Sequence, residues 1–163
     1  MGNETIKAGE SAMPDLLRQE IAAMTKTMVV KVGTRVLTDA AGRLDSQRIE
    51  QLASQIHAVM ESGRKIVLVS SGAVGAGVGR LGLAGRPTDL AHLQAVAAVG
   101  QSMLVEAYER SLFRFGRHAA QILLTADDLE HRTRYLNARN TILTLLELGA
   151  VPVINENDTI SVD

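Results

Sequence analysis

The chain has 163 residues, of which 46% are hydrophobic and 21% charged, a composition typical of one globular domain with a sizeable core. A net charge of −1 and an aromatic content of 2% argue against a nucleic-acid surface, which is usually basic and carries stacking platforms. The absence of cysteine excludes disulfides and thiolate metal sites and fits a reducing cytoplasm. No apolar run approaches the roughly 20 residues that span a bilayer, and residues 1–10 lack a signal peptide's apolar core.

The first 27 residues are expected to form an extension. Residues 1–13 read as a loose polar tail, and residues 14–24 predict a short amphipathic helix. We expect this helix to pack on the surface of the domain, with a partner-binding helix as the alternative.

From residue 28 onward, strand and helix patterns alternate. Short apolar runs predict strands, and apolar residues spaced by three and four predict helices. The predicted strands cover 28–32, 65–70, 119–124 and 151–154, and the predicted helices cover 45–63, 88–112 (broken near Gly100) and 142–149. A turn is expected over 38–44, a loop over 81–87 and a capping-box-like start at Thr125 and Asp128. The crossovers are long enough for parallel strands with helices on both faces, so the expected fold is a three-layer α/β sandwich.

Polar or glycine-containing segments follow all four predicted strands, at 31–33, 70–72, 125 and 155–158. Ligands of such sheets sit beyond the carboxyl ends of the strands, so this pattern predicts a functional site there. We expect the first strand to be central, which makes Lys31 a ligand-facing residue. A solvent-facing edge lysine is the alternative.

The second of these strand ends, Ser70-Ser71-Gly72-Ala73-Val74-Gly75-Ala76-Gly77, predicts a tight turn and then a helix start. Glycine permits close backbone approach and a helix N-terminus favours anions, so the turn suits a phosphate or a carboxylate. A crossover turn without a ligand is the alternative. Lys31 with the N–H groups of Gly33 and Gly72 can neutralise phosphoryl oxygens. Asn155 and Asp158 can hold an amino group, with a simple Asx-turn as the alternative. The four histidines are scattered without metal-ligand spacing, so no metal site is expected.

Four ordered motifs resemble the successive signatures of glutamate 5-kinases, within the amino acid kinase family. They are Val30-Lys31-Val32-Gly33-Thr34, Ser70-Ser71-Gly72-Ala73-Val74, Tyr135-Leu136-Asn137-Ala138-Arg139-Asn140-Thr141 and Val151-Pro152-Val153-Ile154-Asn155-Glu156-Asn157-Asp158. The resemblance covers residues 28–163, as the glutamate-binding half of the kinase domain.

The resemblance implies ATP-dependent phosphorylation of the γ-carboxylate of L-glutamate, the first step of proline biosynthesis, with Mg²⁺ arriving with ATP. It further implies a phosphate- and ATP-binding group of Lys31, Gly33 and Thr34, in which Lys31 contacts the transferred phosphoryl group. A glutamate-binding group of Ser71, Gly72, Ala73, Asn155 and Asp158 is implied as well, with Asp158 on the amino group. The segment 135–140 is implied to shape the glutamate pocket near the place of proline feedback control.

The family's nucleotide-binding half has no counterpart in these residues, so the chain is expected to be a fragment with little or no kinase activity of its own. We also expect its last strand, 151–154, to lack its next neighbour and so to form an exposed edge, which favours poor solubility or self-association into a homo-oligomer. A non-catalytic glutamate- or proline-binding module is the alternative function, and the parent protein is either a stand-alone kinase or the kinase half of a bifunctional pyrroline-5-carboxylate synthase. A cytoplasmic location is expected, with no membrane or nucleic-acid partner.

Overall fold

The computed structural model describes residues 12–39 and 43–161, with side chains from residue 15 onward. Most of the predicted tail over 1–13 lies outside the described residues. The elements are α1 (Ala12–Met24), β1 (Thr27–Val32), α2 (Thr34–Leu37), α3 (Ser46–Glu61), β2 (Lys65–Ser70), α4 (Ala73–Leu81), α5 (Leu90–Phe113), β3 (Ala119–Leu124), α6 (Ala126–Glu130), α7 (Arg132–Glu147) and β4 (Val151–Glu156). All four predicted strands are therefore present.

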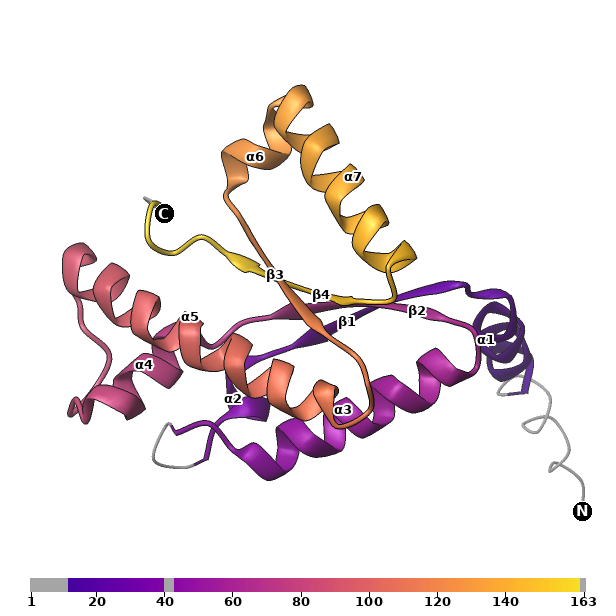
Figure 1. Ribbon diagram of the computed structural model, residues 1–163, viewed down its shortest axis with the longest axis horizontal. Coiled ribbons are helices and arrows are strands. Elements are labelled where there is room, and N and C mark those ends of the chain that lie inside the picture. Colours follow the sequence, from indigo (N-terminus) through magenta and orange to yellow (C-terminus); the bar gives the residue numbers. More distant parts are fainter. Residues whose placement is uncertain (1–11, 40–42, 162–163) are drawn as a thin grey trace, which may run out of the picture.

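The four strands form one parallel sheet in the order β1-β2-β4-β3. Helices α3, α4 and α5 lie on one side of this sheet, and α6 and α7 lie on the other (Figure 1). The connections β1–β2 and β2–β3 run in one direction across the sheet, and the connection β3–β4 runs back. Because all three connections have the same handedness, the helices of the last one lie on the opposite face. The predicted three-layer α/β sandwich is confirmed.

Two expectations about strand position are wrong. The strand β1 pairs only with β2 and is an edge strand among the described residues, whereas it was expected to be central. The strand β4 pairs with both β2 and β3, whereas it was expected to lack its next neighbour and form an exposed edge. The two errors have different causes. β1 is an edge because every later strand lies on its β2 side, and β4 is internal because the third crossover returns it between β2 and β3. A single sequence does not record this strand order.

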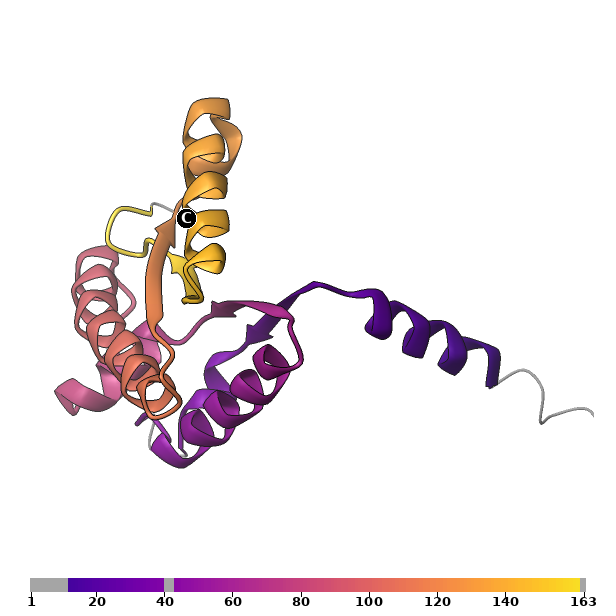
Figure 2. The same ribbon diagram turned by 45° about the vertical axis from the view of Figure 1, so that its right-hand side comes forward.

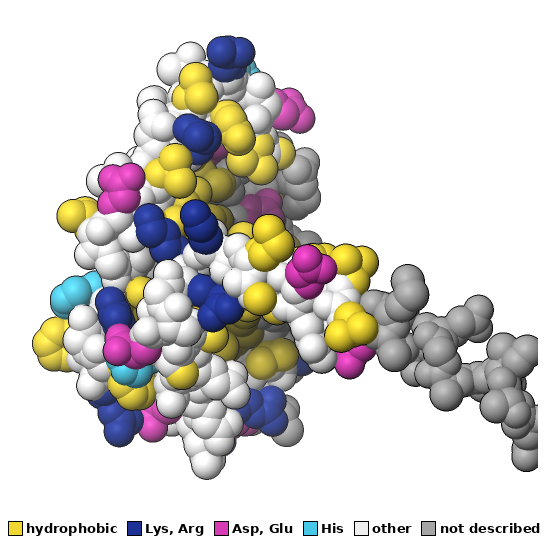
Figure 3. All heavy atoms as spheres, turned by 90° about the vertical axis from the view of Figure 1, so that its right-hand side faces the viewer, with side chains coloured by type: hydrophobic (Ala, Val, Ile, Leu, Met, Phe, Trp, Pro, Cys, Tyr) yellow, Lys and Arg dark blue, Asp and Glu magenta, His cyan; other side chains and the backbone are white. Residues whose placement is uncertain are grey.

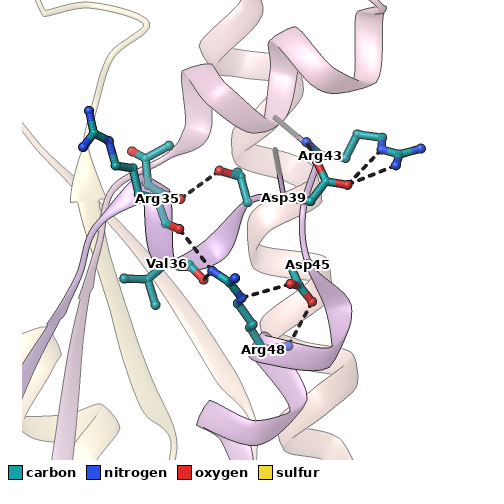
Figure 4. Close-up of polar contacts among 8 residues, drawn as sticks. Arg35, Val36, Asp39, Arg43, Asp45 and Arg48 are labelled. Carbon is teal, nitrogen blue, oxygen red and sulfur yellow. Dashed lines mark hydrogen bonds and ion pairs between the residues drawn. The ribbon is translucent and has the colours of Figure 1, made fainter. Parts of the chain in front are cut away.

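The predicted starts of α3 and α5 are confirmed by side-chain caps, whereas the helix predicted over 142–149 begins ten residues earlier, at Arg132. The Asp45 carboxylate accepts a hydrogen bond from the Arg48 backbone N–H at 3.2 Å, and Asp89 caps α5 in the same way. The Arg48 guanidinium also points from α3 toward the carbonyl oxygens of Arg35 and Val36, at 3.3 and 3.5 Å (Figure 4). These contacts tie α3 to the short helix α2 that follows β1.

Helix α5 runs unbroken through Gly100, so the predicted break there is wrong. A Cβ atom at this position would lie 1.7 Å from the Ala73 carbonyl oxygen of α4. The glycine therefore permits close packing of α4 on α5 and does not interrupt the helix.

Helix α1 projects away from the body of the molecule (Figure 2). Its apolar side chains Leu17, Ile21 and Met24 are 59%, 58% and 75% exposed, and hydrophobic side chains gather on this projecting segment in Figure 3. The helix is therefore amphipathic as predicted, but it does not pack on the domain surface in the part of the chain that the structure describes. No helix within the described ranges is long and apolar enough to cross a membrane.

The main core lies between the sheet and the layer that contains α3 and α5. Its fully buried members include Ile49 of α3, Leu68 of β2 and Leu104 and Tyr108 of α5. Burial of each such side chain contributes about 1.5–3 kcal/mol. On the other face, Leu146 is the only buried residue of α7. The better-packed layer therefore carries α4 and α5, the helices next to the predicted site.

Candidate functional site

A cavity of about 310 Å³ opens at the carboxyl ends of β2 and β4, where the sequence predicts a ligand site. The residues around it come from the start of α2, the turn after β2, helix α4, the loop before α5 and the end of β4. They are Thr34, Ser71, Gly72, Ala73, Val74, Gly75, Val78, Arg86, Asn155, Glu156 and Asp158. Six of the eight predicted site residues meet here, and only Lys31 and Gly33 are missing.

One wall of the cavity is the turn between β2 and α4. Gly72 has φ +121°, a conformation that other residues rarely adopt, and a Cβ there would lie 3.3 Å from the Thr34 Cα. The Ser71 backbone N–H donates to the Val32 carbonyl at 3.0 Å, which ties the turn to the end of β1. The first N–H groups of α4, from Ala73 onward, have no acceptor within the helix and carry its positive dipole end. This wall therefore offers hydrogen-bond donors.

The part of the lining at the end of β4, the acceptor wall, carries oxygen acceptors from Asn155, Glu156 and Asp158. Partial burial raises the pKa of the Asp158 carboxyl, the neighbouring Glu156 carboxylate raises it further, and Arg86 opposes both. The Asn155 side chain is buried, and its Nδ2 donates to the Gln101 Oε1 of α5 at 2.7 Å. The side chain of Asn155 is thus engaged with α5, whereas in the same segment Asn157 makes a local turn contact, its Oδ1 accepting from the Thr159 hydroxyl at 2.6 Å.

Arg86 is a cavity residue that the sequence reasoning missed. It lies in the predicted loop before α5, beside Pro87, and nothing in such a loop indicates which side chain turns toward a ligand. Its positive charge lies in a cavity that also contains two carboxylates. Together with the α4 N-terminus it gives the cavity donors as well as acceptors.

Lys31 lies apart from this cavity. Its exposed side chain lines a separate cavity of about 420 Å³ with residues of α2 and α3, including Arg48 and Gln51. Gly33 lines neither of the two cavities and is the N-cap residue of α2. The structure thus assembles the predicted glutamate-binding group with Thr34, but it does not join Lys31 to it.

The segment 135–140 also lies apart from the site. It belongs to α7, on the opposite face of the sheet from α4, and none of its residues lines the cavity. Tyr135 and Ala138 border a separate, mainly apolar cavity of about 210 Å³. The expectation that this segment shapes the glutamate pocket is therefore not met within the described residues. No group of three or more His, Cys, Asp or Glu side chains among those residues is placed to hold a metal ion.

Comparison with known proteins agrees with this architecture. Residues 26–163 match the amino acid kinase family. The chain is 52% identical over 160 residues to the glutamate 5-kinase of Rhodopirellula baltica, a match that covers 98% of this chain and 40% of that protein. It is 55% identical over 138 residues to the glutamate 5-kinase of an Azoarcus species, with coverage of 85% and 37%. The chain thus spans about two fifths of the length of these relatives.

The structure of a carbamate kinase from Giardia lamblia, solved with AMP-PNP, has a TM-score of 0.52 to this chain at 17% identity, over 83% of this chain and 57% of that one. At this identity the likeness concerns the fold alone. The fold is an α/β fold with a cavity at the carboxyl edge of a parallel sheet. The chain belongs to the amino acid kinase family.

Proposed function

We propose that this chain is the glutamate-binding part of a glutamate 5-kinase, which uses ATP to phosphorylate the γ-carboxylate of L-glutamate. The observation that carries the proposal is the division of the cavity into a donor wall and an acceptor wall. An amino acid is a zwitterion, with carboxylates that need donors and an ammonium group that needs acceptors. The sequence identity to glutamate 5-kinases favours glutamate among the amino acids.

In this proposal the acceptor wall holds the ammonium group. The Asp158 carboxylate binds it by charge, and Asn155 adds a hydrogen bond beside it. Ser71 and the N–H groups of Gly72 and Ala73 hold a glutamate carboxylate on the donor wall. Fixing both ends of the substrate orients it for phosphoryl transfer, which depends mainly on positioning and charge stabilisation.

The chemical step forms one bond and breaks one. A γ-carboxylate oxygen of glutamate bonds to the γ-phosphorus of ATP, and the bond from that phosphorus to the β,γ-bridging oxygen breaks, which gives γ-glutamyl phosphate and ADP. We place the phosphoryl group near Gly33 and Thr34. Both residues follow Lys31 closely in sequence, and Thr34 lines the cavity, so Lys31 can reach the phosphoryl group from the side of α2 and α3. Mg²⁺ is proposed to arrive on the ATP phosphates. The proposal includes the role in proline biosynthesis, feedback inhibition by proline, self-association and a cytoplasmic location.

The test is a chimera, because the curated relatives are longer than this chain. Residues 26–163 replace the matching segment of the Rhodopirellula baltica glutamate 5-kinase, and γ-glutamyl phosphate is trapped with hydroxylamine in the presence of L-glutamate and Mg-ATP. We expect an active chimera that loses activity with Lys31→Ala or Asp158→Asn. A Gln47→Met control, on the exposed start of α3, is expected to keep it.

A chimera that folds as judged by circular dichroism, yet forms no γ-glutamyl hydroxamate, contradicts the proposed kinase function. If that inactive chimera still binds L-glutamate, the non-catalytic binding module becomes the better account.

A further inference from the structure

A buried glutamine stands behind the acceptor wall. Gln101 of α5 is 7% exposed and lies on the helix face of Ala97, Leu104 and Tyr108, all of which are buried. Its Oε1 accepts a hydrogen bond from the Asn155 Nδ2 at 2.7 Å, and its Nε2 is buried with no partner among the described residues. A buried amide with an unpaired donor is unfavourable compared with an apolar side chain of similar shape. Packing alone therefore gives no reason for a glutamine here.

The contact with Asn155 supplies a reason. A primary amide has a donor end and an acceptor end, so holding one end fixes the direction of the other. When Nδ2 of Asn155 faces Gln101, its Oδ1 is directed away from α5. Asn155 lines the cavity beside the carboxylates of Glu156 and Asp158.

We propose that Gln101 is a positioning residue that holds Asn155 with Oδ1 toward the cavity, so that the wall presents oxygen acceptors to an ammonium group. This proposal rests on the proposed function, which supplies the ammonium ligand. Gln101 itself does not touch the substrate. Gln101 instead keeps the Asn155 amide from turning by 180°, an orientation that would present N–H groups to the cationic end of the ligand.

The orientation is testable without a ligand. In wild-type protein, amide NMR of the side-chain NH₂ groups is recorded, and the Asn155 pair is assigned by its loss in Asn155→Ser. We expect slow solvent exchange for an Nδ2 proton of Asn155, and fast exchange in Gln101→Met. The exposed amide of Asn137 serves as the reference. Exchange of both Asn155 protons as fast as those of Asn137 overturns the proposal.

Ligand binding then separates positioning from a merely structural role. Calorimetric titrations compare L-glutamate with glutarate, which has both carboxylates but no ammonium group. Gln101→Met removes the acceptor at nearly constant shape, so we expect it to raise the Kd for L-glutamate roughly tenfold or more. Its Kd for glutarate is expected to stay at the wild-type value. Gln101→Glu keeps an acceptor oxygen and is expected to restore L-glutamate binding, and Gln47→Met is expected to change neither Kd.

Two results would overturn the proposal. Equal weakening for both ligands in Gln101→Met would assign Gln101 a structural role. A loss in Gln101→Glu as large as in Gln101→Met, with thermal unfolding showing that both variants fold, would mean that Gln101 acts as a donor and that Asn155 is turned the other way. If wild-type protein does not bind L-glutamate, the proposed function fails, and the exchange measurement still decides the orientation.

Discussion

The contact between α4 and α5 leads to a sharp prediction about Gly100→Ala. Helix α4 carries Ala73 and the donor wall, and it rests on α5 at this glycine. A Cβ at position 100 would lie 1.7 Å from the Ala73 carbonyl oxygen and 2.5 Å from the Gly77 nitrogen. Both neighbours are backbone atoms, so no change of side-chain rotamer relieves the overlap. The shorter distance is 1.3 Å below 3.0 Å, a limit that real Cβ contacts respect.

The helices must therefore move apart, which breaks packing along their shared face. Overpacking a core usually costs about 1–3 kcal/mol and sometimes more, and a contact with rigid backbone belongs at the upper end of that range. Replacing glycine by alanine inside a helix returns about 1 kcal/mol through helix propensity. We expect a net loss of about 2 kcal/mol in the free energy of unfolding.

Urea unfolding at pH 7 measures this loss, with Gly85→Ala as the control. A Cβ at Gly85 meets nothing within 4 Å, so that variant is expected to be as stable as the wild type or slightly more stable. Gly100→Ala is also expected to weaken L-glutamate binding because Ala73 moves. A Gly100→Ala protein with wild-type stability and affinity would refute the close packing of α4 on α5.

Three further predictions concern stability. Asp158→Asn is expected to raise stability at pH 7, because burial raises the pKa of the folded carboxyl and so disfavours its charged form. This gain in stability should vanish as pH falls below the ordinary carboxyl pKa of 3.8, because the group is then protonated in both the folded and the unfolded protein. A lower stability of the variant in urea unfolding at pH 7 would contradict the prediction. Tyr108→Phe leaves the buried Ser70 hydroxyl without its 3.0 Å partner and is expected to lower the free energy of unfolding by about 1–3 kcal/mol. If the effects of Tyr108→Phe and Ser70→Ala simply add in the double mutant, the hydrogen bond between the two hydroxyls does not contribute to stability. Leu104→Ala, at a fully buried position, should lower the free energy of unfolding by about 2–5 kcal/mol. Leu148→Ala, at a residue 77% exposed, serves as the control, and an equal loss in both variants would contradict the assigned core.

The sequence predicts most elements of this fold because they carry a local signal, whereas α2 and the part of α7 before residue 142 were not predicted as helix. The Asp45 and Asp89 caps, the capping box at Thr125 and the apolar strand runs all act within a few residues of chain. Gly100 misled the prediction because its role depends on a distant helix. A mid-helix glycine that allows close packing has the same sequence signature as one that breaks the helix.

The sequence does not predict the order of the strands or which side chains line the cavity. The edge position of β1 depends on which strands pair. Lys31 lies beside β2, yet its side chain lines the cavity of α2 and α3, a choice that no local pattern records. Arg86 gave no usable signal. Gln101 did give one, because it is a polar residue at an apolar position of a helical stripe, but its partner Asn155 is 54 residues away. Local patterns thus predict which strand ends carry the site, and the tertiary packing decides which side chains meet there.

The most direct test of the account is the affinity of the 163-residue chain for L-glutamate, compared by isothermal titration calorimetry at pH 7 between wild type and Asp158→Asn. The account predicts saturable binding of one L-glutamate to the wild type. It also predicts an affinity roughly tenfold or more lower in the variant, because the ammonium group loses its charged acceptor. Equal affinity in both proteins, or no binding by a folded wild type, would contradict the claim that the cavity between α4 and β4 holds glutamate by its ammonium group.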